Sequence, residues 1–199
     1  MTIRYPNGKK YSPKKETVKQ SVTPNDTYRN RGQTLEDELN DTNAYYLSRE
    51  IAVIHKKPVP IQIVKVNYPN RSAAVITEAY YRTPSTTDYN GVWNGKYIDF
   101  EAKETKNKTS FPLQNLHAHQ VEHMKNVYQQ NGIPFLIIRF SNLNRYFLLP
   151  YETMIKKWER MNNGGRKSIA LTELEEEAIE IQTGFMPTID YLKGLASFI

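Results

Sequence analysis

The chain has 199 residues, a formal net charge of +6 and no cysteine, which excludes disulfide bonds and thiolate metal sites. Its hydrophobic content of 39% is sufficient for the core of a single domain with tails. Since no stretch approaches the ~20 apolar residues of a membrane span, and the first residues lack the apolar region of a secretory signal, we expect a cytoplasmic protein without membrane association.

The first 33 residues carry the whole net charge, because eight basic residues stand there against two acidic ones and the rest of the chain is balanced. This segment is rich in Pro, Thr, Ser and Asn and lacks an apolar period, so we expect residues 1–33 to form a disordered basic arm. Such an arm attracts nucleic acid, and Arg31 is its candidate DNA-binding residue. A purely solubilising tail is the alternative.

The next segment predicts a helix that begins near Thr34, because acidic residues fill the first turn and apolar residues then recur at helical spacing. The expected buried stripe consists of Leu35, Leu39, Thr42 and Tyr46. Glu36 lies off that stripe. It either faces solvent or reaches a functional site on the first helix.

Ile51–His55 predicts a short buried strand, and an unusual segment follows over about residues 58–80. Ile61–Val66 predicts a strand, Tyr68–Ser72 a turn, and Ala73–Tyr81 a returning strand or helix. Basic residues interleaved with tyrosines suit bent or branched DNA, since bases and sugars stack on the rings. A hairpin packed on the core is the alternative. The candidate DNA-binding residues here are Lys56, Lys65, Arg71, Tyr80 and Tyr81.

The stretch Thr86–Thr105 predicts a β-hairpin around which the domain is organised. Asn94-Gly95 separates two β-type segments and favours a type I′ turn, which needs positive φ at both central residues. With these two residues as the loop, Asp88 lies directly opposite Glu101, and one face of the hairpin is apolar. The other face carries Thr86, Asp88, Asp99, Glu101 and Lys103.

Two carboxylates placed opposite each other repel by about 0.2–1 kcal/mol, and a divalent cation would offset that repulsion. Carboxylate oxygens are hard ligands that suit Mg²⁺ or Mn²⁺. Lys103, two residues beyond Glu101 on the same face, would lie beside the metal, an arrangement suited to phosphodiester cleavage. An ordinary charged sheet face is the alternative, and a bulge at Asn90-Gly91 would shift the register.

After a basic loop, Phe111-Pro112 precedes a helix that we expect Gly132 to end. Its core stripe is Leu116, Val121, Met124 and Tyr128. Gln120 lies at the edge of this stripe, where its side-chain carbonyl either turns toward the active face or bonds to backbone. We expect two buried strands next, at 135–140 and 146–149, and then helices at 151–160, from Thr172, and at 191–198.

Several motifs together resemble one nuclease family. Asp88, twelve further residues and Glu101-Ala102-Lys103 resemble the core of the PD-(D/E)xK nuclease superfamily, with Thr87 in place of the proline. The surrounding sequences resemble the RecU family of Holliday junction resolvases over essentially the whole chain. These are I-R-Y-P-N-G-K at 3–9, N-R-G-Q-T-L-E at 30–36, S-T-T-D-Y-N-G at 85–91, Y-I-D-F-E-A-K-E-T-K-N-K-T-S-F-P-L-Q-N at 97–115 and G-G-R-K-S-I at 164–169.

The resemblance implies an α/β fold that is restriction-endonuclease-like, with a central mixed sheet flanked by helices. The nuclease domain would span residues 34–199 and carry a protruding stalk at about 58–80. It implies a Mg²⁺ site (Mn²⁺ as the alternative) formed by Asp88, Glu101, Gln120 and an oxygen of Thr86, chosen over Thr87 because it shares the face of Asp88. Lys103 would act on the water or the phosphate. Glu36 matches a first-helix glutamate of the superfamily and archaeal resolvases.

The expected substrate is four-way junction DNA. Symmetric incision of a junction requires two active sites related by a two-fold axis, so a homodimer is expected. A recombinase and a branch-migration helicase are further expected partners. Two alternatives remain: an endonuclease specific for plain duplex, or a DNA-binding modulator of a recombinase or helicase.

Overall fold

The computed structural model describes residues 34–70, 73–82 and 86–197. The expected basic arm at 1–33, its Arg31 and the stalk residue Arg71 lie outside the described residues. Among the described residues, no helix is long and apolar enough to cross a membrane.

The described residues form a six-stranded mixed sheet with the strand order β1-β4-β5-β7-β8-β10. Its strands are β1 Val53–Lys56, β4 Tyr89–Trp93, β5 Lys96–Thr105, β7 Ile133–Phe140, β8 Arg145–Pro150 and β10 Ile179–Ile181. β5 and β7 run parallel, and the other neighbours run antiparallel. Parallel strands need a crossover connection, which helix α2 (Ala118–Gln129) supplies between β5 and β7. The predicted central mixed sheet is therefore confirmed.

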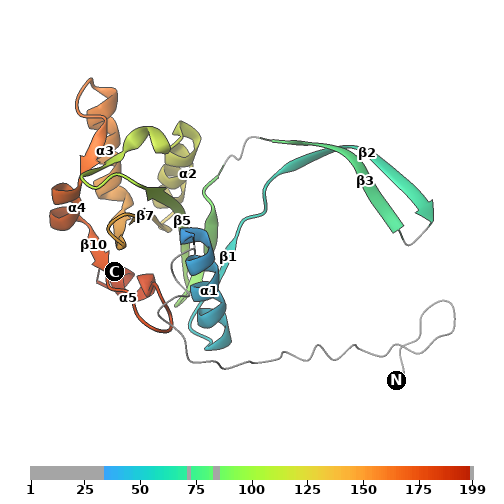
Figure 1. Ribbon diagram of the computed structural model, residues 1–199, viewed down its shortest axis with the longest axis horizontal. Helices are drawn as coiled ribbons and strands as arrows, with labels where there is room; N and C mark the ends of the chain where they lie inside the picture. Colours follow the sequence, from blue (N-terminus) through green and yellow to red (C-terminus); the bar gives the residue numbers. More distant parts are fainter. Residues whose placement is uncertain (1–33, 71–72, 83–85, 198–199) are drawn as a thin grey trace. The chain divides into compact units, whose positions relative to one another are not determined.

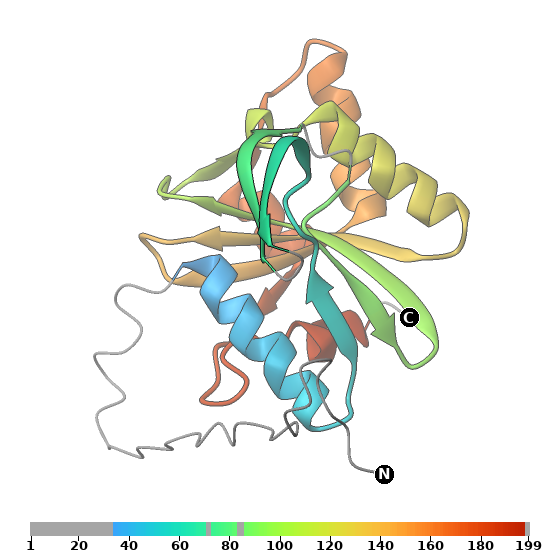
Figure 2. The same ribbon diagram turned by 90° about the vertical axis from the view of Figure 1, so that its right-hand side faces the viewer.

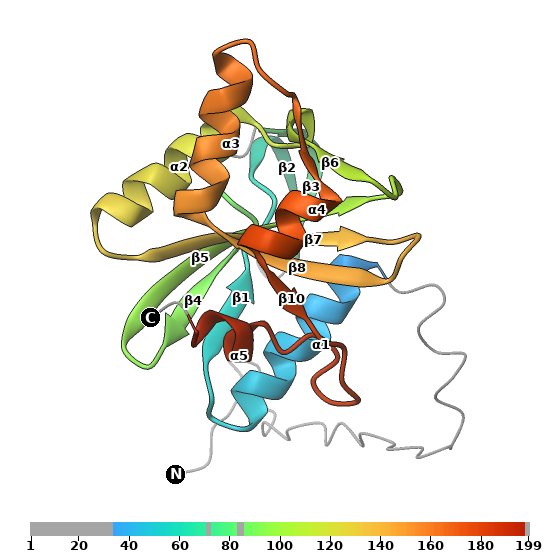
Figure 3. The same cartoon turned by 90° about the vertical axis from the view of Figure 1, so that its left-hand side faces the viewer.

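Helices lie on both faces of this sheet (Figure 2, Figure 3). Helices α1 (Leu35–Ser48) and α5 (Tyr191–Leu195) pack on one face, where Phe100 and Phe135 are fully buried. Helices α2, α3 (Tyr151–Asn162) and α4 (Leu171–Glu177) contribute to a second core on the other face, around Met124 and Met154. A short 3₁₀ helix at Leu113–Asn115 precedes α2, and β6 (Ser110–Pro112) pairs with β9 (Ser168–Ala170). The sheet between two apolar layers makes β5 a buried strand.

The β4–β5 hairpin has the predicted register. Tyr89 pairs with Phe100, and Asn94 and Gly95 both take positive φ, 49° and 74°, as a type I′ turn requires. The stacked rings of Tyr89 and Phe100, with centroids 4.8 Å apart, anchor the start of β4 to the core. Asp88 directly precedes Tyr89, the first residue of β4, and is positioned by the anchoring of that residue.

The first helix also agrees with its prediction. Thr34 caps α1 through reciprocal hydrogen bonds with Asp37, and the four residues of the expected stripe are buried. A strand is present near Ile51–His55, but the prediction that it is buried is wrong. The strand β1 begins at Val53 and forms an edge of the sheet. There Ile54 alone of its four residues is buried, and Val53 is 49% exposed.

The stalk is a separate two-stranded sheet of β2 (Ile61–Asn70) and β3 (Ala73–Tyr81), drawn as a long ribbon in Figure 1. The returning segment is a strand, and β2 continues through the expected turn at Tyr68 to Asn70. Shifts in its pairing, including one between Asn67 and Asn70, accommodate Pro69, which has no N–H to donate. Large apolar side chains on both strands are exposed, so the alternative of a hairpin packed on the core is not observed.

The end of α2 differs from its prediction. Asn131, with φ 60°, takes the left-handed position that was expected of Gly132. The Asn131 and Gly132 N–H groups bond to the carbonyls of Tyr128 and Val127, which is a Schellman motif. A glycine is needed at 132 for a different reason, which is close packing. A Cβ added to Gly132 would lie only 2.5 Å from Val127 Cγ1. Leu116 is buried but precedes the helix, which begins at Ala118.

Candidate active site

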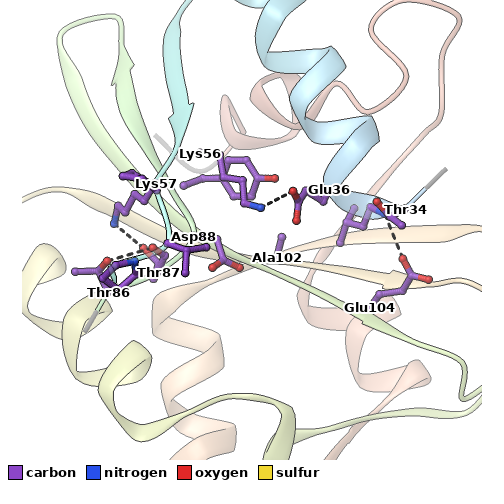
Figure 4. Close-up of a pocket in the computed structure, with 14 residues that line it drawn as sticks. Thr34, Glu36, Lys56, Lys57, Thr86, Thr87, Asp88, Ala102 and Glu104 are labelled. Carbon is purple, nitrogen blue, oxygen red and sulfur yellow. Dashed lines mark hydrogen bonds and ion pairs between the residues drawn. The ribbon is translucent and has the colours of Figure 1, made fainter. Parts of the chain in front are cut away.

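A cavity of about 410 Å³ lies where the first turn of α1, the segment after β1 and the start of β4 meet β5. Its lining includes Glu36, Lys57, Thr86, Asp88 and Glu104 (Figure 4). It therefore opens at the point where the hairpin register brings Asp88 next to Glu101.

Asp88 and Glu101 are neighbours in the structure. The backbone N–H of Asp88 donates to Glu101 Oε2 at 3.1 Å. The Asp88 carbonyl accepts from the Lys57 N–H at 2.7 Å, so the chain leaves the β4–β5 ladder just before Tyr89. The same register would place Thr86 opposite Lys103, but that pair is not formed, because the pairing of β4 with β5 begins at Tyr89.

Glu101 is fully buried and close to a cation. Its Oε1 forms an ion pair with Lys103 Nζ at 2.7 Å, as the shared face predicted. Burial raises the pKa of Glu101 to about 7, with Lys103 opposing and the Asp88 charge adding to the shift. Lys103 supplies one positive partner, but burial and the neighbouring Asp88 charge still disfavour the ionised form of Glu101.

The donor set fits a hard divalent cation. Asp88 and Glu101 supply carboxylate oxygens, and Lys103 lies beside them in an ion pair with Glu101. Such a cation would balance the two charges that the fold brings together. The chemistry of these residues therefore favours Mg²⁺ or Mn²⁺ over softer metals.

Two threonines precede Asp88 and have different surroundings. Thr87 is buried, and its hydroxyl is engaged by Asp99 and by Lys57 Nζ at 2.9 Å. Thr86 is half-buried, lines the cavity and donates its hydroxyl to the Thr87 carbonyl at 3.3 Å. Because the Thr86 hydroxyl acts as the donor in this bond, the lone pairs of its oxygen stay available.

Gln120 is buried on α2, and its Oε1 accepts a hydrogen bond from the His117 N–H at 3.0 Å. Because α2 returns between the parallel strands β5 and β7, it runs opposite to β5. His123 on α2 contacts Asp99 on β5, so one helical turn back along α2 brings Gln120 toward Glu101, two residues further along β5. An amide oxygen accepts two hydrogen bonds or ligands, so the cap leaves one lone pair.

Comparison with known proteins gives these residues a family. A model of the RecU family, described as "Recombination protein U", matches residues 30–197. The chain belongs to the RecU family.

Its curated relatives match over almost the full length of both chains. A protein of Bacillus mycoides (strain KBAB4), named "Holliday junction resolvase RecU", is 59% identical over 195 residues, which cover 98% of this chain and 97% of the relative. A protein of the same name in Bacillus cereus (strain B4264) is 58% identical with the same coverage. Among solved structures, Archaeoglobus fulgidus Hjc, a Holliday junction resolvase, matches at 10% identity with a TM-score of 0.38, covering 71% of this chain and 94% of that one.

The other candidates of this RecU-family chain divide into two groups. Glu36 and Lys56 line the cavity and form an ion pair with each other (Figure 4), at side-chain exposures of 53% and 34%. Lys65, Tyr80 and Tyr81 lie instead on the exposed β2–β3 ribbon, where Tyr81 is 84% exposed. The structure brings the first group to the cleft and leaves the second group on the stalk.

Sequence reasoning missed a polar cluster next to the cavity, of which Lys57 lines the cavity itself. Lys57, Asp99 and His123 form a polar cluster beside Thr87, with Asp99 fully buried. The hairpin pattern assigned Asp99 to the polar face, but its partners lie 24 and 42 residues away. The sequence signal that could have revealed the cluster is Asp99 itself, an acidic residue between the apolar strand residues Ile98 and Phe100.

Proposed function

We propose that this chain is a Mg²⁺-dependent endonuclease of the cytoplasm that resolves Holliday junctions by symmetric incision, as a homodimer. The relatives at 58–59% identity are named for junction resolution, which supports the substrate. The observation that carries the proposal is the Asp88–Glu101–Lys103 group, in which two carboxylate residues are neighbours and a lysine pairs with the buried one.

Asp88, Glu101, Gln120 and an oxygen of Thr86 would hold the metal. A bound Mg²⁺ supplies a water of lowered pKa and neutralises the charge of the scissile phosphate. Lys103, whose side chain is 20% exposed, would orient that water or stabilise negative charge that builds on the phosphate. Its contact with Glu101 fixes the ammonium on the side of the metal ligands.

The stalk and Lys56 would bind the DNA arms. Tyr80 and Tyr81 present open ring faces on which bases or sugars stack, and Lys65 and Lys56 attract the phosphates. Arg31 and Arg71, outside the described residues, stay proposed DNA-binding residues on the strength of their charge. Glu36 holds Lys56 in an ion pair at the cavity, and would release it when a phosphate competes.

The test uses a mobile synthetic four-way junction and a linear duplex of the same arm sequence, each with Mg²⁺, with Mn²⁺ or with EDTA. We expect paired incisions that yield ligatable duplexes from the junction with either metal, and none with EDTA. Equal cleavage of the linear duplex would favour a general endonuclease. Junction binding without cleavage in either metal would favour a modulator of a recombinase or helicase.

A further inference from the structure

A buried carboxylate outside the proposed ligand set lies at the junction of several segments. Asp99 on β5 is fully buried, on the same face of the strand as Glu101. Its Oδ2 receives Lys57 Nζ at 2.8 Å, the Tyr97 hydroxyl at 2.9 Å and His123 Nε2 at 3.2 Å. Its Oδ1 accepts from the Thr87 hydroxyl. Both oxygens are thus occupied by donors, and Asp99 is no free ligand for a metal.

These four donors come from separate parts of the chain. Lys57 follows the edge strand β1, Thr87 belongs to the segment before β4, Tyr97 lies on β5 itself, and His123 lies on α2. Three of these parts also carry proposed ligands: Thr86 and Asp88 adjoin Thr87, Glu101 follows on β5, and Gln120 lies one turn from His123. Asp99 therefore ties together the segments that must converge on a metal.

The Asp88 segment depends on this cluster for its position. Thr86–Asp88 has no strand pairing, and Lys57 holds it at two points: the backbone N–H of Lys57 bonds to the Asp88 carbonyl, and its ammonium bonds to the Thr87 hydroxyl at 2.9 Å. The Lys57 side chain is only 19% exposed, and its anionic partner is Asp99. Without Asp99, this half-buried cation would lose its anionic partner, and the buried Thr87 hydroxyl would lose its acceptor.

Stability alone is a weak reason for such a cluster. Replacing a buried ion pair by apolar groups of similar volume is often neutral or stabilising, because desolvation of the two charges offsets their attraction. A directional network of hydrogen bonds instead fixes one arrangement of its members. The cluster adjoins the one segment of the cleft whose exact position decides where the Asp88 carboxylate points.

We propose that Asp99 is a positioning residue that, through Lys57, Thr87 and His123, sets the geometry of the Asp88–Glu101–Gln120 metal site. This inference rests on the proposed function, since it assigns a role to the same site. Asp99 touches neither metal nor substrate. It acts by holding the segments that carry the ligands.

The experiment measures Mn²⁺ binding by isothermal titration calorimetry without DNA, together with thermal melting and junction binding in EDTA. Asp99→Asn keeps the side-chain volume but removes the charge that holds Lys57. We expect its Mn²⁺ affinity to fall at least tenfold, while junction binding in EDTA changes less than twofold. In cleavage assays, the Mg²⁺ concentration for half-maximal rate should rise by the same factor.

Two variants separate positioning from stability. Glu38→Gln removes another buried carboxylate, bonded to the Tyr146 hydroxyl on the opposite face of the sheet, and should melt earlier without any loss of Mn²⁺ affinity. The double variant Asp99→Leu/Lys57→Met replaces the ion pair by apolar groups, and we expect it to melt cooperatively while its Mn²⁺ affinity remains at least tenfold reduced.

Wild-type Mn²⁺ affinity in Asp99→Asn, or its recovery in the double variant, would overturn the inference. The titration contains no DNA, so it decides on Asp99 whether or not junctions are the substrate. If the wild-type protein binds Mn²⁺ but does not cleave junctions, only the proposed function is overturned. If the unchanged protein binds no Mn²⁺, the metal site and the role of Asp99 both fail.

Discussion

At the residue scale, the site depends on charges that the fold places together at an energetic cost. Asp88 and Glu101 are adjacent, and burial raises the pKa of Glu101 to about 7. Nearby groups compensate only in part, because Lys103 contacts Glu101 at the cost of its own hydration. Groups kept in such surroundings are typical of functional sites, where a missing partner completes the balance.

The ligand assignment predicts separate effects on cleavage and on binding. Asp88→Asn and Glu101→Gln each remove one ligand charge without adding volume, so we expect cleavage to fall at least 10³-fold, about 4 kcal/mol. Junction binding should be retained, since the loss of a negative charge beside DNA weakens no phosphate contact. Gel shift and cleavage are measured on one preparation, with Glu176→Gln, an exposed residue on α4, as control. Cleavage that persists in both variants would contradict the assignment.

At the element scale, the predictions succeeded where interactions between residues close together in the sequence determine the structure. The type I′ turn at Asn94-Gly95 fixes the pairing of the hairpin, and the pairing then places Asp88 beside Glu101. Capping by Thr34 and the stripe of α1 are equally local. The cluster around Asp99 could not be predicted in this way, because Lys57 and His123 reach it through β1 pairing and the α2 crossover. The ribbon of β2 and β3 was recognised, but the length of β2 past Pro69 was not.

Glu173 forms the largest set of polar contacts between α3 and α4. Glu173 accepts from Arg160, from Lys157 and from the Ala170 N–H, and these partners lower its pKa to about 2, with the Arg160 hydrogen bond the largest cause. A lowered pKa in the folded state stabilises the protein above the ordinary value of 4.5, and that stability is lost as the pH falls from 4.5 through about 2.

We therefore expect Glu173→Gln to lower the free energy of unfolding at pH 7 by about 1–2 kcal/mol, below the full linkage value because the side chain is partly solvated. The difference from the unchanged protein should narrow by at least half when urea titrations are repeated near pH 3. Glu176→Gln on the same helix is the control and should change little at either pH. A difference independent of pH would mean that packing, and not the charge of Glu173, stabilises the contact between α3 and α4.

The stalk predicts a difference between branched and linear DNA. Its strands pair with each other and expose Tyr80 and Tyr81, so their replacement leaves the six-stranded sheet of the described residues intact. Replacing Ile61–Ala79 with a short Gly-Ser turn should lower junction affinity at least tenfold, about 1.4 kcal/mol, with much less effect on linear duplex. Cooperative melting of the variant is the control. An equal loss on both DNAs would reduce the stalk to a generic basic surface.

At the scale of the whole molecule, the described part of one chain contains one Asp88–Glu101 pair. On the proposed function, this pair and its cavity would act on one phosphodiester bond at a time. Resolution of a four-way junction requires incision of two strands at symmetric positions. A two-fold dimer supplies two such sites in opposite orientation, and closed two-fold symmetry limits the assembly to a pair.

A mixed dimer tests this requirement. Co-expression of the unchanged chain and Asp88→Asn under different affinity tags, followed by purification on both tags, isolates dimers with one competent site. Because each site cuts one strand, we expect the mixed dimer to nick junctions at a rate within about twofold of one site of the unchanged dimer, while ligatable duplex products fall at least tenfold.

A cruciform plasmid distinguishes the two results, since one nick relaxes it and two paired nicks linearise it. The Glu176→Gln chain, tagged and mixed in the same way, should linearise the plasmid normally. Linearisation by the mixed dimer would show that one site cuts both strands in turn, and a protein that stays monomeric with the junction bound would remove the basis for symmetric incision.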